Sequence, residues 1–142
     1  MQNERPITLV ALDHIVLRTT DLAKMLHFYQ HILGCRLERE LADLGLTQLR
    51  AGSALIDIVT FDSELGKLGG SAPRQDGRNM DHFCLQVAPF VEQEMLTYLS
   101  QQGVKVSEFV ERYGAEGFGR SLYIEDPEGN VVEIKPVLES GY

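Results

Sequence analysis

The sequence predicts an α+β fold built from two copies of one βαβββ module. The clearest sign is an internal repeat: LDHIVLR, which begins at Leu12, returns as MDHFCLQV at Met80, and both copies contain an Asp-His pair. Each copy continues into a segment of helical spacing that ends at a glycine, Gly34 or Gly103, and then into further strand-like segments. A repeat of this length indicates two copies of one supersecondary unit. We expect the copies to pair into a curved mixed sheet that forms a cup.

The first module is expected over about residues 8–62. Alternation of apolar and polar residues predicts a strand over 8–18, and Asp21 is typical of a helix N-cap. The apolar residues after it recur at the spacing of an amphipathic helix that Gly34 ends. These residues are Leu22, Met25, Leu26, Tyr29, Ile32 and Leu33. Three short strands are predicted to follow, at 35–41, 44–51 and 54–61.

Residues 63–78 are rich in glycine and are predicted to link the two modules. The second module, about 79–137, repeats the order of the first, and we expect residues 1–142 to form a single domain. Pro89 fits the first turn of its helix. The stretch 111–119, ERYGAEGFG, is either an ordinary flexible connection or a loop over the cup. The predicted strands are 80–87, 104–111, 120–125 and, after the turn sequence DPEGN, 131–137.

Four residues with metal-ligating side chains share the predicted sheet face that points away from the helices. His14 and His82 lie in the first strand of each module, and Asp57 and Glu133 alternate with apolar residues in the last strands. Two imidazoles with one or two carboxylates suit a divalent ion such as Zn, Ni, Mn or Fe. Asp57 and Glu133 are also the candidate catalytic carboxylates, because a carboxylate beside a metal can act as a general base.

Other polar and thiol residues are expected to lie outside this site. His27 and His31 lie four residues apart on the predicted helix, but they lack the glutamate of H-E-x-x-H and lie off the apolar stripe, so we expect them at the surface. We expect no catalytic role for Asp13 and Asp81. The two cysteines, Cys35 and Cys84, are expected to be buried free thiols.

Five polar side chains are candidates for contacts with an anionic substrate. Strand parity puts three of them on the face of the histidines or of Glu133, and leaves the tyrosine open. The five are Arg18, Gln86, Arg120, Tyr123 and Lys135.

Charge and composition exclude several classes of protein. The net charge of −8 argues against a nucleic-acid partner, which requires a basic face. No apolar run approaches the ~20 residues of a membrane span, so we expect no membrane association. The N-terminal residues lack the basic and apolar regions of a signal peptide, and we expect a cytoplasmic protein.

The chain resembles the vicinal oxygen chelate superfamily, also called the glyoxalase/bleomycin-resistance/dioxygenase superfamily. The resemblance covers about residues 8–137 and rests on DHIVLRTTDLAKMLHFYQHILG, MDHFCLQV and SLYIEDPEGNVVEIKP. It implies paired βαβββ modules around a divalent metal, with His14, His82 and Glu133 at the family's ligand positions. Glyoxalase I-like members have Glu or Gln at the position of Asp57, which is one methylene shorter. The remaining three-ligand set resembles that of the fosfomycin-resistance members.

The resemblance leaves two functions open. One is a metal-dependent enzyme that acts on a small oxygen-rich substrate by lyase, isomerase or dioxygenase chemistry, including ring opening of the fosfomycin type. The other is a metal-free binding protein of the bleomycin-resistance type, which the net charge of −8 favours slightly for a cationic drug. The modest size and exposed sheet edges predict a homodimer, with modules paired either within or across chains.

Overall fold

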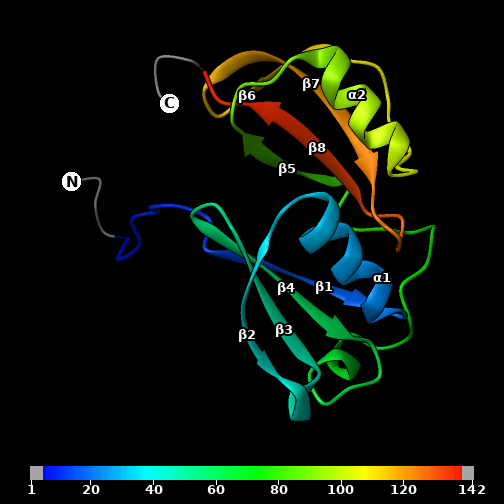
Figure 1. The fold of residues 1–142 in the computed structure, drawn as a ribbon. Coiled ribbons are helices and arrows are strands. Elements are labelled where there is room, and N and C mark those ends of the chain that lie inside the picture. The colour runs from blue at the N-terminus through cyan, green and yellow to red at the C-terminus, as the bar shows by residue number, and fades with distance from the viewer. Residues whose placement is uncertain (1–4, 139–142) are drawn as a thin grey trace.

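The structure is a computed structural model that describes residues 5–138 of the chain, and it contains two βαβββ modules (Figure 1). The first module consists of β1 (His14–Thr19), α1 (Leu22–Leu26), a π-helical segment (His27–Ile32), β2 (Arg36–Leu41), β3 (Leu46–Ala51) and β4 (Ala54–Thr60). The second consists of β5 (His82–Val87), α2 (Glu92–Gln101), β6 (Val110–Gly114), β7 (Gly117–Glu125) and β8 (Val131–Pro136). Short 3₁₀ turns lie at Ala42–Leu44 and at Gly66–Gly69 in the linker. The predicted α+β class and its two-module organisation are confirmed.

The two sheets have the same topology. Their strand orders are β1-β4-β3-β2 and β5-β8-β7-β6, and in each sheet the first strand runs parallel to the last. In the ladders, Val16 lies opposite Asp57 and Cys84 lies opposite Glu133. Each acid therefore sits beside the residue two positions after the histidine of its module, on the histidine's face of the sheet.

The modules share one hydrophobic core. It contains helix-side residues from both sheets, such as Leu17, Ile58, Leu122 and Ile134, together with buried residues of both helices. Helical segments of the first module thus pack between its own sheet and the second module (Figure 1). Because both sheets turn their helix-bearing sides toward this core, the opposite faces, which carry the histidines and acids, both point away from it.

One buried and one partly buried hydrogen bond join the two modules. The fully buried Tyr29 donates its hydroxyl to Asp126 Oδ2 at 2.7 Å, and Tyr98 donates to the carbonyl of Ile32 at 2.7 Å. Burial, followed by the charge of Asp126, raises the pKa of Tyr29 well above its usual value, so this phenol stays protonated. These bonds join the first helical segment to the turn before β8 and to α2, so the module arrangement is specific.

Several predicted boundaries differ from the structure. β1 begins at His14, and residues 8–13 are not in a strand; their sequence from Leu9 to Leu12 is a continuous apolar run without alternation. The helix predicted to end at Gly34 is α-helical only through Leu26 and continues as a π-helix. The spacing of apolar residues over so short a segment does not distinguish an α-helix from a π-helix. Pro89 lies before α2, which begins at Glu92, rather than in its first turn.

Other predictions hold at these helices. Asp21 caps α1, because its side chain accepts a hydrogen bond from the backbone N–H of Lys24. Gly34 follows the helical segment with φ +88°, the left-handed conformation expected of a C′ glycine. No helix within the described range 5–138 is both long and apolar enough to span a bilayer.

The stretch 111–119 is a β-hairpin rather than a loop. β6 and β7 pair from Val110 opposite Ser121 to Gly114 opposite Gly117, so only Ala115 and Glu116 form the turn. The glycines predicted to give flexibility instead lie in a regular ladder.

Candidate metal centre

The second module brings His82 and Glu133 into direct contact. His82 Nε2 lies 3.2 Å from Glu133 Oε1. Zinc–nitrogen and zinc–oxygen bonds of about 2.0–2.2 Å place two neighbouring ligand atoms roughly 3 Å apart. The spacing of these two atoms therefore fits two ligands of one divalent ion.

A carboxylate orients each histidine. His82 Nδ1 lies 2.8 Å from Asp81 Oδ2, and His14 Nδ1 lies 2.7 Å from Asp13 Oδ2. When Nδ1–H donates to the carboxylate, Nε2 carries the free lone pair and is the atom available to a metal. Asp13 and Asp81 thus have an orienting role that their sequence position alone did not indicate.

The arrangement of His82 and Glu133 requires a positive charge between the two side chains. With Nδ1–H donated to Asp81, the lone pair of Nε2 faces the carboxylate oxygen Oε1, and both atoms are acceptors. The second oxygen, Glu133 Oε2, already accepts the hydroxyl of Ser121 at 2.6 Å, and Glu133 is 7% exposed. A proton or a metal ion between Nε2 and Oε1 satisfies both acceptors.

Asp57 is the corresponding acid of the first module. It is 4% exposed, and its Oδ2 accepts a hydrogen bond from Gln48 Nε2 at 3.0 Å, while Arg39 Nε donates to Gln48 Oε1 at 2.5 Å. In the described part of the chain, Asp57 Oδ1 is buried without any hydrogen-bond partner. A buried carboxylate oxygen without a donor is costly, so this atom fits a role as a ligand or proton acceptor.

His14 completes the first module's pair. Its pKa is raised above the usual value, mainly by the hydrogen bond to Asp13; burial lowers the pKa by less, and the charges of Asp57 and Asp13 raise it further by smaller amounts. The effect of Asp57 indicates that the exposed imidazole and the buried carboxylate lie on one side of the sheet, as the ladder requires.

The two pairs do not meet within one chain. Among residues 5–138, no cluster of three or more His, Cys, Asp or Glu side chains has the spacing of a metal site. The reason is the shared core, which turns the face with His14 and Asp57 and the face with His82 and Glu133 away from each other. Each face presents half of the predicted ligand set.

The predicted substrate contacts separate into two groups. Arg18 donates Nε to the carbonyl of Gly66 at 2.9 Å and so holds the linker. Arg120 lies on the helix-bearing side of β7, where Nε donates to Glu92 Oε2 at 2.6 Å, so it does not line the candidate site. Strand parity gives the face of a side chain but not its partner, so it predicted neither contact.

The other three lie on the face of Glu133. The ladder puts Tyr123 directly opposite Glu133, with its ring 5.1 Å from the ring of His82. Gln86 is exposed on β5 opposite Lys135, which is 3% exposed. Strand parity predicted the face of Gln86 and Lys135, whereas it left Tyr123 open, and the β7–β8 ladder places that residue.

Arg112 was not predicted to belong to the site. Its Nη1 donates to the carbonyl of Ser121 at 2.6 Å and to Ser121 Oγ at 3.0 Å, and its guanidinium lies 4.2 Å from the ring centre of Tyr123. The signal that could have found it is ladder parity, since Arg112 pairs with Gly119, but that requires the hairpin register. In the first module Gln48, through Arg39, has a similar role beside Asp57 and was also missed.

The remaining candidates do not enlarge the metal centre. His27 and His31 are exposed, as predicted, and their rings stack 4.8 Å apart. Both cysteines are free, as predicted, but neither is buried: Cys35 is partly buried, and Cys84 is exposed on β5, the edge strand of its sheet. Partial burial of its thiol, followed by the charge of Glu133, raises the pKa of Cys84 to about 11, so the thiol stays protonated at neutral pH.

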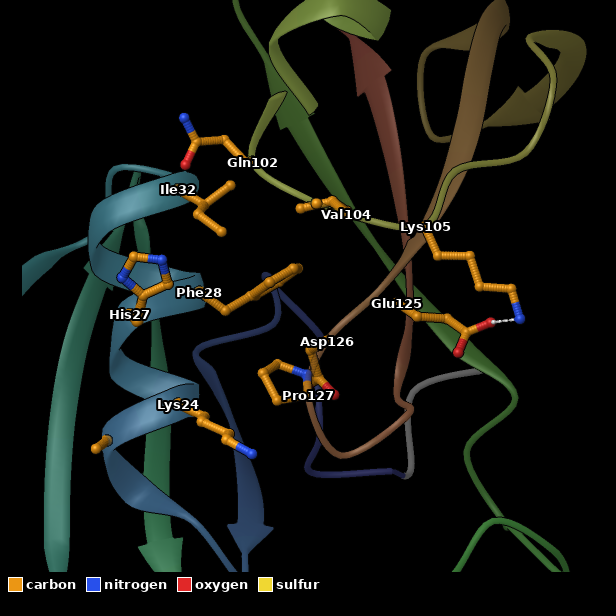
Figure 2. A pocket seen from close by; sticks show the side chains of 12 residues that line it. Lys24, His27, Phe28, Ile32, Gln102, Val104, Lys105, Glu125, Asp126 and Pro127 are labelled. Carbon is orange, nitrogen blue, oxygen red and sulfur yellow. Dashed lines mark ion pairs between the residues drawn. The ribbon is translucent and has the colours of Figure 1, made fainter. Parts of the chain in front are cut away.

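A separate cleft lies between the modules (Figure 2). Lys24, His27 and Phe28 of the first module line one wall, and the other wall includes Glu125, which pairs with Lys105 at 3.2 Å. None of the four candidate metal ligands lines this cleft, so it is distinct from the candidate metal centre.

The fold and the paired His–carboxylate faces define a two-module α+β protein of the glyoxalase type. A model of the Glyoxalase/Bleomycin resistance protein/Dioxygenase superfamily matches residues 11–134, and the chain belongs to this superfamily. Members usually bind a divalent metal.

Similar proteins cover nearly the whole chain. An integron cassette protein of V. cholerae is 27% identical, with a TM-score of 0.72 over 93% of this chain and 98% of that one. Virulence protein STM3117 of Salmonella typhimurium is 28% identical over 127 residues, which are 87% of this chain and 81% of the relative. A lactoylglutathione lyase of Agrobacterium tumefaciens is 23% identical, with a TM-score of 0.64 over 93% and 96% of the two chains, and this likeness concerns the fold alone.

Proposed function

We propose that the protein is a divalent-metal-dependent enzyme that acts on a small oxygen-rich substrate. The observation that carries the proposal is the contact of His82 Nε2 with Glu133 Oε1 at 3.2 Å, in which Asp81 engages the other ring nitrogen and Ser121 the other carboxylate oxygen. This arrangement directs two acceptor atoms at one point, which suits a cation with N and O ligands.

The complete site is proposed to form between two chains. His82 and Glu133 of one copy would face His14 and Asp57 of a second copy, so that a homodimer holds two such sites. Support comes from the outward direction of both faces and from exposed apolar side chains on and before β1. The exposed fractions are 64% for Ile7, 91% for Leu9, 96% for Val10, 83% for Leu12 and 50% for Val16. An apolar stretch as exposed as this is typical of an interface.

The metal, Zn, Ni, Mn or Fe, would supply Lewis-acid stabilisation of negative charge on substrate oxygens. Around it, Asp81 keeps the lone pair of His82 on Nε2, and Ser121 fixes the rotamer of Glu133. Asp57, with its free buried oxygen, would accept a substrate proton as general base. Gln48 holds the other oxygen of Asp57 and orients the carboxylate for that role.

The superfamily and this donor set support the proposed reaction class. Lyase, isomerase and dioxygenase chemistry, including epoxide ring opening, all use a substrate whose oxygens sit beside a divalent ion. We propose one of these activities in the cytoplasm. No nucleic acid or membrane partner is proposed, in keeping with the net charge of −8.

Metal content tests the proposal. Untagged protein purified without chelator should contain close to one divalent ion per chain by elemental mass spectrometry, and His82→Ala should lose it. His27→Ala is the matched control, because His27 is exposed on the first helical segment and should leave metal content unchanged. If the wild-type protein takes up no added divalent ion, the enzyme proposal fails, and a metal-free binding protein becomes the better account.

A further inference from the structure

We propose that the substrate carries an oxyanionic group, a carboxylate or a phosphate-like group, which Arg112 binds beside Glu133 with the positive charge of Lys135 next to it. This inference rests on the proposed function, because it names the substrate class of the same site. It concerns the second-module face formed by β5, β8, β7 and β6.

Arg112 is held in place with part of its guanidinium free. Both of its hydrogen bonds, to Ser121 O at 2.6 Å and to Ser121 Oγ at 3.0 Å, use Nη1. A guanidinium has five N–H donors, so within residues 5–138 its Nε and Nη2 edge is left without a hydrogen bond. The ring of Tyr123, 4.2 Å from Cζ, supports the guanidinium, and the same ring lies 5.1 Å from that of His82. Ser121 Oγ, which accepts from Arg112, donates to Glu133 Oε2 at 2.6 Å, so a ligand beside Glu133 is close to a preorganised cation.

Lys135 adds a second positive charge from beneath the hairpin. The side chain is buried, and Nζ donates to the carbonyl of Gly117 at 2.9 Å. A Cβ at Gly119 would lie 3.2 Å from Nζ, and one at Gly114 would lie 3.3 Å from Cε. The missing side chains at these hairpin glycines thus leave room for the side chain of Lys135. This explains why glycines occupy these positions of the ladder.

Arg112 and Lys135 are positive charges without a carboxylate partner in the described part of the chain. Arg120, on the opposite side of the hairpin, instead pairs with Glu92. The carboxylate of Glu133 accepts a hydrogen bond from Ser121 and lies against His82. A buried ammonium with a single neutral acceptor is costly, and a ligand anion would offset that cost. These two cations stand together although the whole chain carries −8.

The spacing of Glu133, Lys135 and Arg112 on this face suits a single small molecule. Glu133 and Lys135 are two residues apart on β8, which is about 7 Å along a strand. Continuing the ladder from Tyr123 opposite Glu133 places Ser121, the partner of Arg112, beside Lys135. A substrate of a few bonds can therefore keep its metal-facing oxygens near Glu133 and its anionic group near Arg112.

Binding of two simple anions tests the inference. Inorganic phosphate and malonate are titrated by calorimetry, at fixed ionic strength, into zinc-loaded protein and into chelator-treated protein. We expect wild type to bind at least one of them, and the preferred probe distinguishes a phosphate-like group from a carboxylate. Arg112→Gln should weaken binding by about tenfold to a hundredfold, the range for a charge-assisted hydrogen bond. Arg112→Lys should also weaken it, because the planar fork is lost while the charge remains.

Two further variants address the lysine, and one serves as control. Lys135→Met keeps the apolar stem and should weaken binding of the preferred anion by about tenfold or more. Gly119→Ala keeps the lysine but displaces Nζ, and should also weaken it. Arg120→Gln removes one positive charge from the other side of β7 and should stay within about twofold of wild type. Thermal unfolding shows which variants are folded, and the conservative Arg112→Lys keeps the test decisive if Arg112→Gln does not fold.

The outcomes separate this inference from the proposed function. If wild type binds neither anion, or if folded Arg112 and Lys135 variants bind as wild type does, the anion site is refuted even where metal binding holds. If Arg112-dependent binding persists in chelator-treated protein that never takes up zinc, the anion site stands and the metal-dependent function fails.

Discussion

Asp57 and Glu133 occupy equivalent ladder positions in the two sheets, yet they differ in how their carboxylates are satisfied. Glu133 lies opposite Cys84; its Oε2 accepts from Ser121, and its Oε1 lies 3.2 Å from His82 Nε2. Asp57 lies opposite Val16, and within residues 5–138 one of its oxygens has no partner. The repeat thus supplies one acid that is held against a histidine and one whose buried oxygen has no neighbouring donor in the described residues, and both can accept a metal ion or a proton.

The free oxygen of Asp57 gives a prediction for stability. Asp57→Asn removes a buried negative charge. The free energy of unfolding of the metal-free variant should therefore equal that of the metal-free wild type or exceed it by up to about 1 kcal/mol. The same variant should bind metal or substrate more weakly. Urea unfolding and calorimetric metal titration measure the two effects. A clear loss of stability without any functional effect would mean that Asp57 is structural.

Asp81 should control metal affinity without binding the ion. Asp81→Asn weakens the acceptor that orients His82, and variants of this type lower metal affinity by about 10–100-fold. Asp76→Asn, which alters an exposed acid in the linker, is the control. The measurement is competition with a fluorescent zinc chelator. Equal affinities for Asp81→Asn and wild type would show that the 2.8 Å contact has no part in the site.

Glu128 is predicted to stabilise the module interface in a pH-dependent way. Its Oε2 accepts hydrogen bonds from Thr19 Oγ1 at 2.8 Å, from Thr20 N at 2.5 Å and from Thr20 Oγ1 at 2.7 Å. Partial burial raises the pKa of Glu128, but these hydrogen bonds and the charge of Arg78 lower it by more, so the pKa lies below its usual value of 4.5. The contribution is complete above that value and is lost as the pH falls through the lower pKa of the folded protein.

Glu128→Ala should therefore cost roughly 1–2 kcal/mol in the free energy of unfolding at pH 7. The difference from wild type should shrink as the pH falls below 4.5 and through the lowered pKa of the folded protein, where the carboxyl becomes protonated. Urea unfolding at pH 7 and at pH 3.5 measures both, with Glu40→Ala, an exposed acid on β2, as control. A difference that stays constant with pH would assign the stabilisation to packing instead of charge.

Sequence periodicity predicted the modules and the side of each strand, since alternation is a local property. His14 and Glu133 were therefore placed on the correct faces. It did not predict Arg112, because its position depends on the register of a hairpin whose glycines were interpreted as a loop. Nor did it predict that Arg18 would bind the linker, a contact between residues distant in sequence.

The arrangement of the two modules could not be predicted from local sequence patterns either. The repeat predicts a cup in which four ligands converge, and periodicity alone does not say whether the two sheets turn these faces toward or away from each other. Core packing decides this, through contacts such as Tyr29 with Asp126 that join residues from different modules. The orienting role of Asp13 and Asp81 depends on side-chain rotamers, which the Asp-His sequence does not determine.

Subunit mixing tests the central claim most directly, namely that two chains complete one metal site. His14→Ala and His82→Ala proteins are each purified, mixed, unfolded and refolded together, and their metal content is measured by elemental mass spectrometry. Each variant alone should bind little metal. A mixed dimer should hold one site with both histidines intact and one with neither, so metal should return to about half of one ion per chain within the mixed dimers. Absence of metal from confirmed mixed dimers, while refolded wild type binds it fully, would contradict a site shared between chains.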